Sequence, residues 1–234
     1  MLTKRPSHER GHFDHGWLKT YHTFSFADYY DPANTQFRSL RVINDDRIAA
    51  GRGFGMHPHR DMEIITYILS GEIRHEDSMG NAGTIRAGDV QRMTAGTGIV
   101  HSEFNPSESE PVHLLQIWLF PSRQGLKPGY EQRTFHDQDK RNTLCRIASH
   151  DGRNDSVTIH QDASVYASVV SDGAVLTHHF IAGRAGFLQV ARGKLTVNDL
   201  PLSHGDSVAL EDEPEIRITA PENGEAEFLF FDLG

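Results

Sequence analysis

The chain has 234 residues, of which 37% are hydrophobic and 24% charged, and its formal net charge is −9 at pH 7. This length suits one large all-β domain or two domains of about 100 residues or more. The negative charge argues against general affinity for nucleic-acid phosphates or anionic membranes, so we expect neither direct nucleic-acid binding nor membrane association.

Short apolar or alternating segments predict β-strands along the chain, whereas no segment keeps a helical apolar period for three turns. Gly-containing turns such as SGE, RAGD, ARGK and SHGD bound these segments, as in an antiparallel sandwich or barrel. We therefore predict an all-β protein. The clearest predicted strands are, in chain order, EIITYIL (63–69), VHLLQIWLF (112–120), FLQV (187–190), KLTV (194–197), SVAL (207–210), EIRIT (215–219) and EFLFF (227–231).

The two halves of the chain share a faint internal repeat. YILSGEI (67–73) resembles QVARGKL (189–195), which aligns Gly71 with Gly193, and the AGD turn (87–89) resembles the HGD turn (204–206). Two copies of one barrel explain this repeat most simply, with the polar stretch 132–143 as connector. We expect the barrels to cover residues 1–133 and 134–234.

Cysteine usage and the N-terminus indicate a cellular location. The single cysteine, Cys145, excludes an intrachain disulfide, has no partner motif and is expected to be inert. The first residues, MLTKRPSHER, lack the apolar segment of a secretory signal, and no apolar run reaches the length of a membrane span. We therefore predict a cytoplasmic protein. The 15 histidines are the unusual part of the composition, and they direct attention to metals and proton transfer.

Two residue pairs form the candidate site. His57 and His59, and likewise His101 and Glu103, are separated by one residue. Side chains two residues apart on a strand project to the same face, roughly 7 Å apart, so both can approach one ion. Either pair alone is more typical of a solvated strand face. Together, on neighbouring strands inside a barrel, the pairs would supply three imidazoles and one carboxylate.

This set of donors restricts the metal. It contains too much nitrogen for Mg²⁺ or Ca²⁺, and it lacks the thiolates of a structural zinc site. An octahedral ion held by these side chains would keep positions open for substrate or O₂, as in non-haem iron oxygenases. We expect Fe(II), with Mn, Ni, Cu, Zn or Co as alternatives.

The internal repeat predicts that only one barrel has this chemistry. The alignment pairs His57 with His179, but it places apolar residues opposite His59, His101 and Glu103. We therefore expect the metal site in the N-terminal barrel and a degenerate C-terminal barrel without one.

Glycines around both pairs give the sequence a family resemblance. Gly51 precedes His57, and Gly98 and Asn105 flank His101, at intervals that resemble the two motifs of the cupin family, although Gly96 stands where proline is usual. The segment GWLKTYHTFSFADYYDP (16–32) and the stretch 54–103 resemble more specifically the pirin family. The resemblance implies two cupin barrels in one chain, each a jelly roll.

The two resemblances differ over one carboxylate. The general cupin pattern implies that Glu63 is a ligand, whereas the pirin pattern implies His57, His59, His101 and Glu103. Strand register does not decide whether Glu63 is a ligand. Glu63 lies an even number of residues beyond His59, so both side chains would project to the same face of a continuous strand. We follow the pirin pattern and expect Glu63 to lie behind the ligands rather than on the metal.

The pirin resemblance also implies a function. Bacterial pirins resemble quercetinases, that is, quercetin 2,3-dioxygenases, which use O₂ to open the central ring of a flavonol and release carbon monoxide. For this chain it implies a flat, chelating substrate of the flavonol kind, with Glu103 as both ligand and catalytic base. A rival function implied by the same family is a non-enzymatic, iron-binding and redox-sensitive regulator that acts through a protein partner such as a transcription factor. A third alternative is a bicupin that isomerises or oxidises another small molecule.

Other residues near the motifs are expected to have structural roles. His22 and His75 could orient a ligand, but surface or turn positions fit their surroundings better. His113 alternates with apolar residues and is expected to be buried or to line the barrel. Aromatic residues that we expect to pack in the core or at an edge, rather than to hold substrate, are Phe24, Phe26, Tyr29 and Tyr30.

Overall fold

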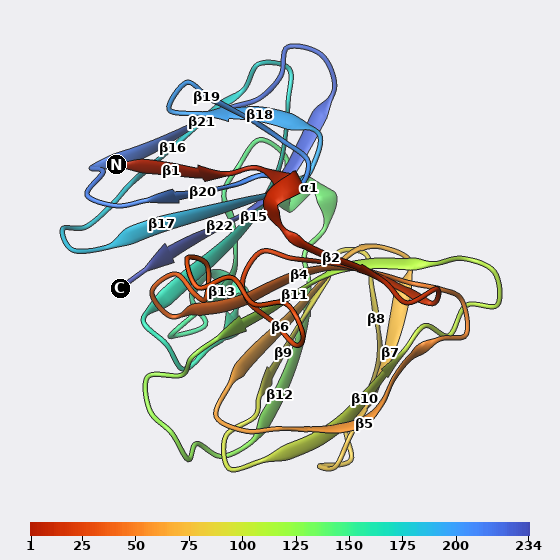
Figure 1. Cartoon of the computed structure of the whole chain (residues 1–234). Coiled ribbons are helices and arrows are strands. Elements are labelled where there is room, and N and C mark those ends of the chain that lie inside the picture. Colours follow the sequence, from red (N-terminus) through yellow and green to blue (C-terminus); the bar gives the residue numbers. More distant parts are fainter. The chain divides into compact units, whose positions relative to one another are not determined.

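The computed structural model describes all 234 residues, and their contacts divide the chain into two units of antiparallel strands (Figure 1). The first barrel comprises Gly11–Thr134 together with Val157–Gln161. The second barrel comprises Met1–Arg10, Phe135–Ser156 and Asp162–Gly234. The predicted all-β class is confirmed. The only α-helix, α1 (Asp137–Lys140), has four residues, and no helix has the length and apolar character needed to cross a membrane.

In the first barrel, two antiparallel sheets face each other (Figure 1). The strands are β2 (Gly11–Asp14), β3 (Leu18–His22), β4 (Leu40–Ile48), β5 (Gly53–His59), β6 (Glu63–Ser70), β7 (Glu72–Asp77), β8 (Ala82–Arg86), β9 (Asp89–Thr94), β10 (Ile99–Phe104), β11 (Val112–Leu119), β12 (Gly129–Thr134) and β14 (Val157–Thr158). The larger sheet has the order β12-β9-β6-β11-β4-β3-β2, and the smaller sheet has the order β5-β10-β7-β8.

The second barrel repeats this plan. Its strands are β1 (Leu2–Arg5), β13 (Cys145–Ser149), β15 (Ala163–Ser171), β16 (Val175–His179), β17 (Ala185–Arg192), β18 (Lys194–Val197), β19 (Leu200–Ser203), β20 (Ser207–Leu210), β21 (Glu215–Thr219) and β22 (Glu225–Leu233). Two short 3₁₀ helices, η1 (Ser7–Glu9) and η2 (Arg153–Asp155), accompany them. Among the strands of this barrel, the larger sheet follows the order β1-β20-β17-β22-β15-β13, and the smaller sheet has the order β16-β21-β18-β19.

The predicted repeat is confirmed in the geometry of the turns. Gly71 joins β6 to β7 with a φ of +76°, and Gly193 joins β17 to β18 with a φ of +74°. Both turns need the left-handed conformation that glycine adopts without strain. The smaller sheets also match, because β5-β10-β7-β8 and β16-β21-β18-β19 follow one order.

Six of the seven predicted segments lie within strands: 63–69 in β6 and the others in β17, β18, β20, β21 and β22. The seventh, 112–120, extends one residue beyond β11. The connector predicted at 132–143 is only partly correct. Residues 132–134 form the end of β12, which pairs with β9, and residues 137–140 form α1. These strand residues are polar because β12 is the edge strand of its sheet, where one side of the backbone is unpaired.

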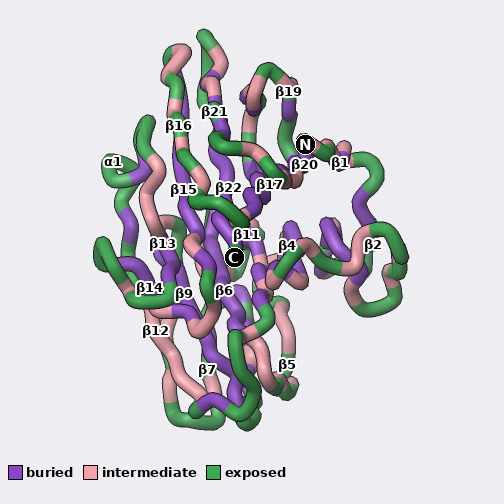
Figure 2. The backbone as a smooth tube through the Cα atoms, turned by 90° about the vertical axis from the view of Figure 1, so that its left-hand side faces the viewer, coloured by how far each residue is buried: buried purple, intermediate pink, exposed green.

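Burial separates the two sheets of the first barrel (Figure 2). Every residue of β9 and all but the last of β6 are buried, whereas no residue of β5 is fully buried. A strand that is covered on both faces usually has a continuous apolar sequence. This explains the run of mostly apolar residues IITYIL in β6. The candidate ligands on β5 therefore lie on the more accessible wall.

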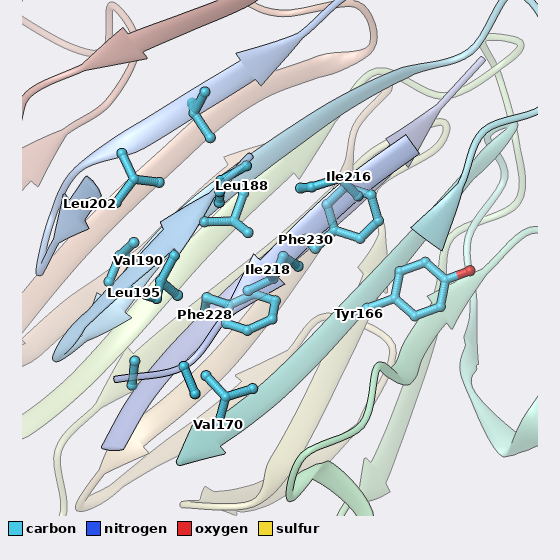
Figure 3. Packing of buried hydrophobic residues seen from close by; sticks show 14 of the residues in the cluster. Tyr166, Val170, Leu188, Val190, Leu195, Leu202, Ile216, Ile218, Phe228 and Phe230 are labelled. Atoms are coloured by element: carbon cyan, nitrogen blue, oxygen red, sulfur yellow. The ribbon is translucent and has the colours of Figure 1, made fainter. Parts of the chain in front are cut away.

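The core of the second barrel is formed mainly by apolar side chains of its two sheets (Figure 3). Phe228 and Phe230 of β22 are completely buried there, as are Ile216 and Ile218 of β21. Tyr166 of β15 lies at the edge of this cluster, and Figure 3 shows its hydroxyl pointing away from the apolar residues.

Gly96 explains why the second cupin motif of this chain lacks its usual proline. The residue has a φ of +48°, and a Cβ atom there would lie 2.0 Å from the carbonyl oxygen of Leu126. Proline is restricted to negative φ, and any side chain would collide with the Leu126 backbone.

We expect Gly96→Ala to destabilise the protein by at least about 2 kcal/mol, because both backbone strain and the collision with Leu126 oppose it. Urea unfolding of the parent and the variant measures this change. Gly80→Ala is a matched control, since Gly80 has a φ of +89° but open space around its Cβ position. Equal losses in both variants would contradict the steric part of this explanation.

Candidate metal centre

Three of the four predicted ligands converge in the first barrel. The antiparallel pairing of β5 with β10 places His57 directly opposite His101, and His59 follows on the same face of β5. The ring centroids are 4.4 Å apart for His57 and His101, 4.8 Å for His57 and His59, and 4.9 Å for His59 and His101. One nitrogen of each ring lies within 4.8 Å of the others, a spacing at which all three could hold one ion.

Glu103, the fourth predicted ligand, lies in an adjoining group. A register shift separates it from His101 on β10, and it is 3% exposed. Its carboxylate forms a second group with His75 and His101, again within 4.8 Å. It accepts hydrogen bonds from Gln116 Nε2 at 3.0 Å and from Thr66 Oγ1 at 3.5 Å. His101 thus belongs to both groups, and Glu103 is not grouped with His57 and His59.

The electrostatics of the site favour the neutral form of His59 and His101. Burial, together with the charge of His57, lowers the pKa of His59 to about 4. Burial lowers the pKa of His101 to about 2, and His57, His59 and His75 add to this effect. Neutral imidazole is the form that binds metals. Burial also raises the pKa of Glu103 to about 7, although the hydrogen bonds from Gln116 and Thr66 oppose the shift.

His75 orients His101, and the expectation of a surface or turn position was wrong. His75 is completely buried on β7, with its Nδ1 3.3 Å from His101 Nδ1 and its Nε2 3.3 Å from Asp77 Oδ2. If His75 donates its Nε2 proton to Asp77, its Nδ1 accepts a proton from His101 Nδ1, and His101 Nε2 keeps a lone pair for a metal. The alternation of Ile73 and His75 on β7, both buried, is the sequence signal for this position.

The free nitrogens in the cluster fit a transition metal. His101 Nε2 is buried and has no hydrogen-bond partner. His57 Nδ1 lies 2.7 Å from the carbonyl oxygen of Gly55 and donates to it, which leaves His57 Nε2 as a lone-pair donor. Buried nitrogens without partners are costly unless something binds them.

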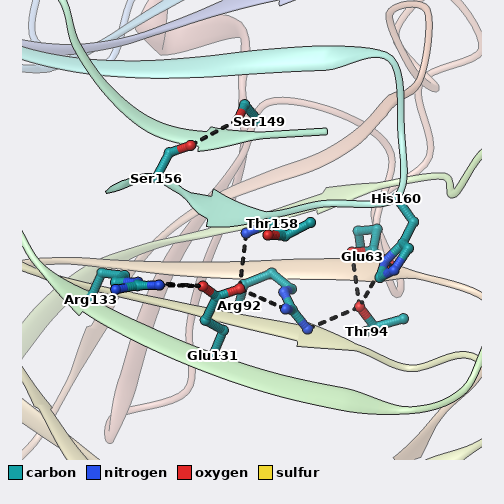
Figure 4. A network of polar contacts seen from close by, with 9 residues as sticks. All are labelled: Glu63, Arg92, Thr94, Glu131, Arg133, Ser149, Ser156, Thr158 and His160. Carbon is teal, nitrogen blue, oxygen red and sulfur yellow. Dashed lines mark hydrogen bonds and ion pairs between the residues drawn. The ribbon is translucent and has the colours of Figure 1, made fainter. Parts of the chain in front are cut away.

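Glu63 is held in a different network (Figure 4). Thr94 Oγ1 donates to its Oε2 at 3.0 Å, and His160 Nδ1 lies 3.4 Å from its Oε1. Arg92 donates in turn to Thr94 and to Glu131. Burial raises the pKa of Glu63. In this arrangement Glu63 faces Thr94 and His160, and it belongs to neither candidate metal group.

A cavity of about 330 Å³ adjoins the histidines. Its walls include the aromatic side chains of Phe26, Phe54 and Trp118. Three atoms of its lining residues are buried without a hydrogen-bond partner, namely Thr20 Oγ1, Asp46 Oδ1 and Trp118 Nε1. Burial raises the pKa of Asp46 to about 7, and the nearby charges of Asp45 and Glu103 add to this shift. An apolar cavity with a few unpaired polar atoms is typical of a small-molecule site.

Two residues near this cavity differ from their predicted roles. His22 was expected at the surface or in a turn, but it is buried, lines the cavity and hydrogen-bonds Asn44 through Nδ1 at 2.7 Å. Phe26 was expected only to pack, but it also lines the cavity, in edge contact with Trp118 at 5.3 Å. Phe24 is buried, as expected, and His113 is half-buried with its Nε2 2.7 Å from Asp45 Oδ1.

No motif in the sequence indicates that Asp46, Gln116 and Trp118 are site residues. The apolar residues of β11 were recognised, but Gln116 and Trp118 alternate with them and face the cavity instead. The sequence signal for these cavity residues is therefore their position on the strand, between the apolar residues that face the core.

The corresponding strands of the second barrel have other side chains. β16 pairs with β21 as β5 pairs with β10, yet the residues aligned with His101 and Glu103, namely Ile218 and Ala220, are buried and apolar. His179, aligned with His57, has a side chain that is 75% exposed and lies beside Glu215.

The chain resembles known proteins over its full length. The family model "Pirin" matches residues 3–119, and the model "Quercetinase C-terminal cupin domain" matches residues 146–233. Quercetin 2,3-dioxygenase of Escherichia coli strain K12 is 47% identical over 233 residues, which cover 100% of this chain and 99% of that protein.

Two crystal structures show the same similarity. YhhW from Escherichia coli superposes with a TM-score of 0.95 at 46% identity, covering 100% of this chain and 98% of that one. The bacterial pirin YhhW in complex with nickel(II) superposes with a TM-score of 0.94 at 46% identity, covering 100% and 99%.

The fold and the site together define a two-barrel cupin protein with a histidine cluster of the metal-binding kind in its first barrel. The chain belongs to the pirin family, as its motifs predicted.

We expect His75→Phe to weaken metal binding by about 10- to 100-fold, because the ring of His101 loses the partner that fixes its orientation. Competition with a chelator measures the affinity. His179→Phe is the matched control, since it removes an exposed histidine of the second barrel. Unchanged affinity in His75→Phe would refute the orienting role.

Proposed function

We propose that this protein is a metal-dependent quercetin 2,3-dioxygenase, which opens the central ring of a flavonol with O₂ and releases carbon monoxide. The observation that carries the proposal is the convergence of His57, His59 and His101, two of them with strongly lowered pKa values, beside an aromatic cavity. The similarity to Escherichia coli quercetin 2,3-dioxygenase over the whole chain supports it.

In this proposal His57, His59, His101 and Glu103 hold one divalent transition metal, with Fe(II) as the expected ion. Three nitrogen donors and one carboxylate suit Fe(II) and also Mn, Ni, Cu, Zn or Co. The nickel(II) complex of the related YhhW is consistent with this range. When bound, the metal would act as a Lewis acid that stabilises the deprotonated flavonol hydroxyl.

Glu103 acts as the base in this proposal. Its raised pKa, about 7, allows its carboxylate to take the proton of the 3-hydroxyl group and to hold it at neutral pH. Gln116 Nε2 and Thr66 Oγ1 fix the position of the carboxylate. Hydrogen bonds to both oxygens allow Glu103 to be held at one position while its protonation changes.

The cavity binds and orients the flavonol. Phe26, Phe54 and Trp118 offer flat apolar surfaces against which aromatic rings pack and from which water is excluded. The unpaired Trp118 Nε1 can donate to an oxygen of the substrate, and the unpaired Asp46 Oδ1 can accept from a hydroxyl. A polyhydroxylated planar molecule would satisfy both atoms.

We expect His101→Ala and Glu103→Ala each to lower quercetin turnover by about 100-fold or more while the protein remains folded. The measurement mixes metal-loaded protein with quercetin without oxygen and then admits O₂, following the flavonol spectrum and the CO released. His179→Ala is the matched control and should retain activity near the parent level.

The same experiment separates the enzyme from the regulator. A shifted flavonol spectrum without turnover, across protein reconstituted with each candidate metal, would favour a regulator that acts through a protein partner. A fully active, metal-loaded His101→Ala variant would contradict the proposed ligands.

We expect metal affinity to rise with pH through about 7. The pKa of Glu103 is raised to about 7, so below this value the carboxyl is protonated, and the metal must displace the proton. Affinity should therefore fall by up to about tenfold for each pH unit below 7. Titration of the metal between about pH 5.5 and 8 measures this slope, and Glu103→Gln should remove that part of it. An unchanged slope in Glu103→Gln would contradict the assignment.

A further inference from the structure

The second barrel contains a cavity of its own, of about 350 Å³. Its lining includes three arginines and two aspartates. Two of the arginines have carboxylate partners. Arg184 pairs with Asp162 and with Asp232.

Arg153, the second of these arginines, forms close contacts from its Nε to both carboxylate oxygens of Asp151, at 2.8 and 2.9 Å. Two of the three positive charges in the lining are therefore neutralised locally.

Arg146 is the exception. It lines the same cavity, but its two hydrogen bonds go to neutral groups, from Nη1 to Asn154 Oδ1 and from Nη2 to the Tyr166 hydroxyl, both at 2.7 Å. Its Nε is buried without a partner. A guanidinium group that is partly buried and has no carboxylate partner favours an anion beside its Nη groups, each of which has a second N–H.

The position of Arg146 is fixed before any ligand arrives. Its guanidinium carbon lies 5.1 Å from the centre of the Tyr166 ring, and the Tyr166 hydroxyl points out of the apolar core (Figure 3). Tyr166 in turn stacks on Phe230, with ring centroids 5.7 Å apart. An arginine held by neighbours loses little side-chain entropy when it binds, which favours affinity.

The rest of the lining limits the kind of anion. Asp232 is satisfied internally, because although burial raises its pKa, hydrogen bonds with His178 and Arg184 hold the pKa below its usual value. The remaining walls include the exposed imidazole of His179 and the side chain of Ile181, which is 77% exposed. The Tyr166 ring is only 6% exposed, with Arg146 over it, and offers little surface to a ligand. The Ile181 side chain offers an apolar surface, which suits an organic anion with an apolar group better than a compact inorganic ion.

We propose that this second cavity binds a small monocarboxylate with an apolar body, its carboxylate on Arg146 and its apolar part against Ile181. The corresponding sheet of the first barrel carries metal-binding residues, whereas here β21 contributes buried isoleucines. The duplicated barrel thus keeps a cavity, but its histidines lie beside arginines rather than in a three-histidine cluster.

Benzoate is the probe, titrated by calorimetry into the full-length, metal-loaded protein. The parent should bind it, and Arg146→Gln should bind it at least about tenfold more weakly, because the carboxylate loses its charged donor. Arg217→Gln is the matched control, since it removes the same charge from an exposed position of this barrel and should leave affinity within about twofold.

A second set of variants separates the two cavities. His101→Ala should bind benzoate as the parent does, because the metal centre lies in the first barrel. Loss of binding in His101→Ala with retention in Arg146→Gln would overturn the proposal, as would a parent that binds no benzoate. Inorganic phosphate that binds more tightly than benzoate would overturn the proposed class of ligand, because phosphate has no apolar part.

Two further variants test Arg146 if Arg146→Gln fails to fold. Arg146→Lys keeps the charge and should retain part of the affinity. Tyr166→Phe removes only the hydroxyl group that accepts a hydrogen bond from Arg146, and it should lower the affinity for benzoate by a few-fold. Full affinity in both the Lys and the Phe variants would count against the proposed contact.

Discussion

The antiparallel pairing of β5 with β10 is the contact on which the site depends. It places His57 opposite His101, and the alternation of side chains along β5 brings His59 to the same point. Because this point is partly closed to water, the pKa values of His59 and His101 are lowered, and the nitrogens of all three rings lie together. A shift of one residue in this pairing would place the rings of β5 and the ring of His101 on opposite faces of the sheet, and the three nitrogens would no longer lie together.

Two sets of polar residues hold the site, one on each side of the histidines. His75 and Asp77 orient His101 from one side, while Gln116 and Thr66 hold Glu103 from the other. Glu63, the position at which the general cupin pattern has its carboxylate, is engaged with Thr94 and His160. In this chain the carboxylate grouped with His101 is instead that of Glu103, which lies on β10 rather than on β6.

The sequence predicted what depends on local spacing. Paired residues two apart, glycine turns and continuous apolar runs identified the strands, the repeat and the clustered histidines. Contacts between residues that are far apart in the sequence could not be predicted from such local patterns. The segment Met1–Arg10 illustrates this, because β1 pairs with β20 so that Leu2 lies opposite Leu210, and no local pattern indicates that register. Asp46 and Trp118 were missed for the same reason, since only the closed barrel brings them to one cavity.

X-ray absorption spectroscopy of the metal-loaded protein tests the central claim most directly, because it counts the ligands on the ion itself. The structure predicts three imidazole nitrogens together with oxygen donors in the parent, and one imidazole fewer in His57→Ala, whose ring lies directly opposite His101. A first coordination sphere with fewer than three imidazoles, or one that is unchanged in His57→Ala, would contradict the account.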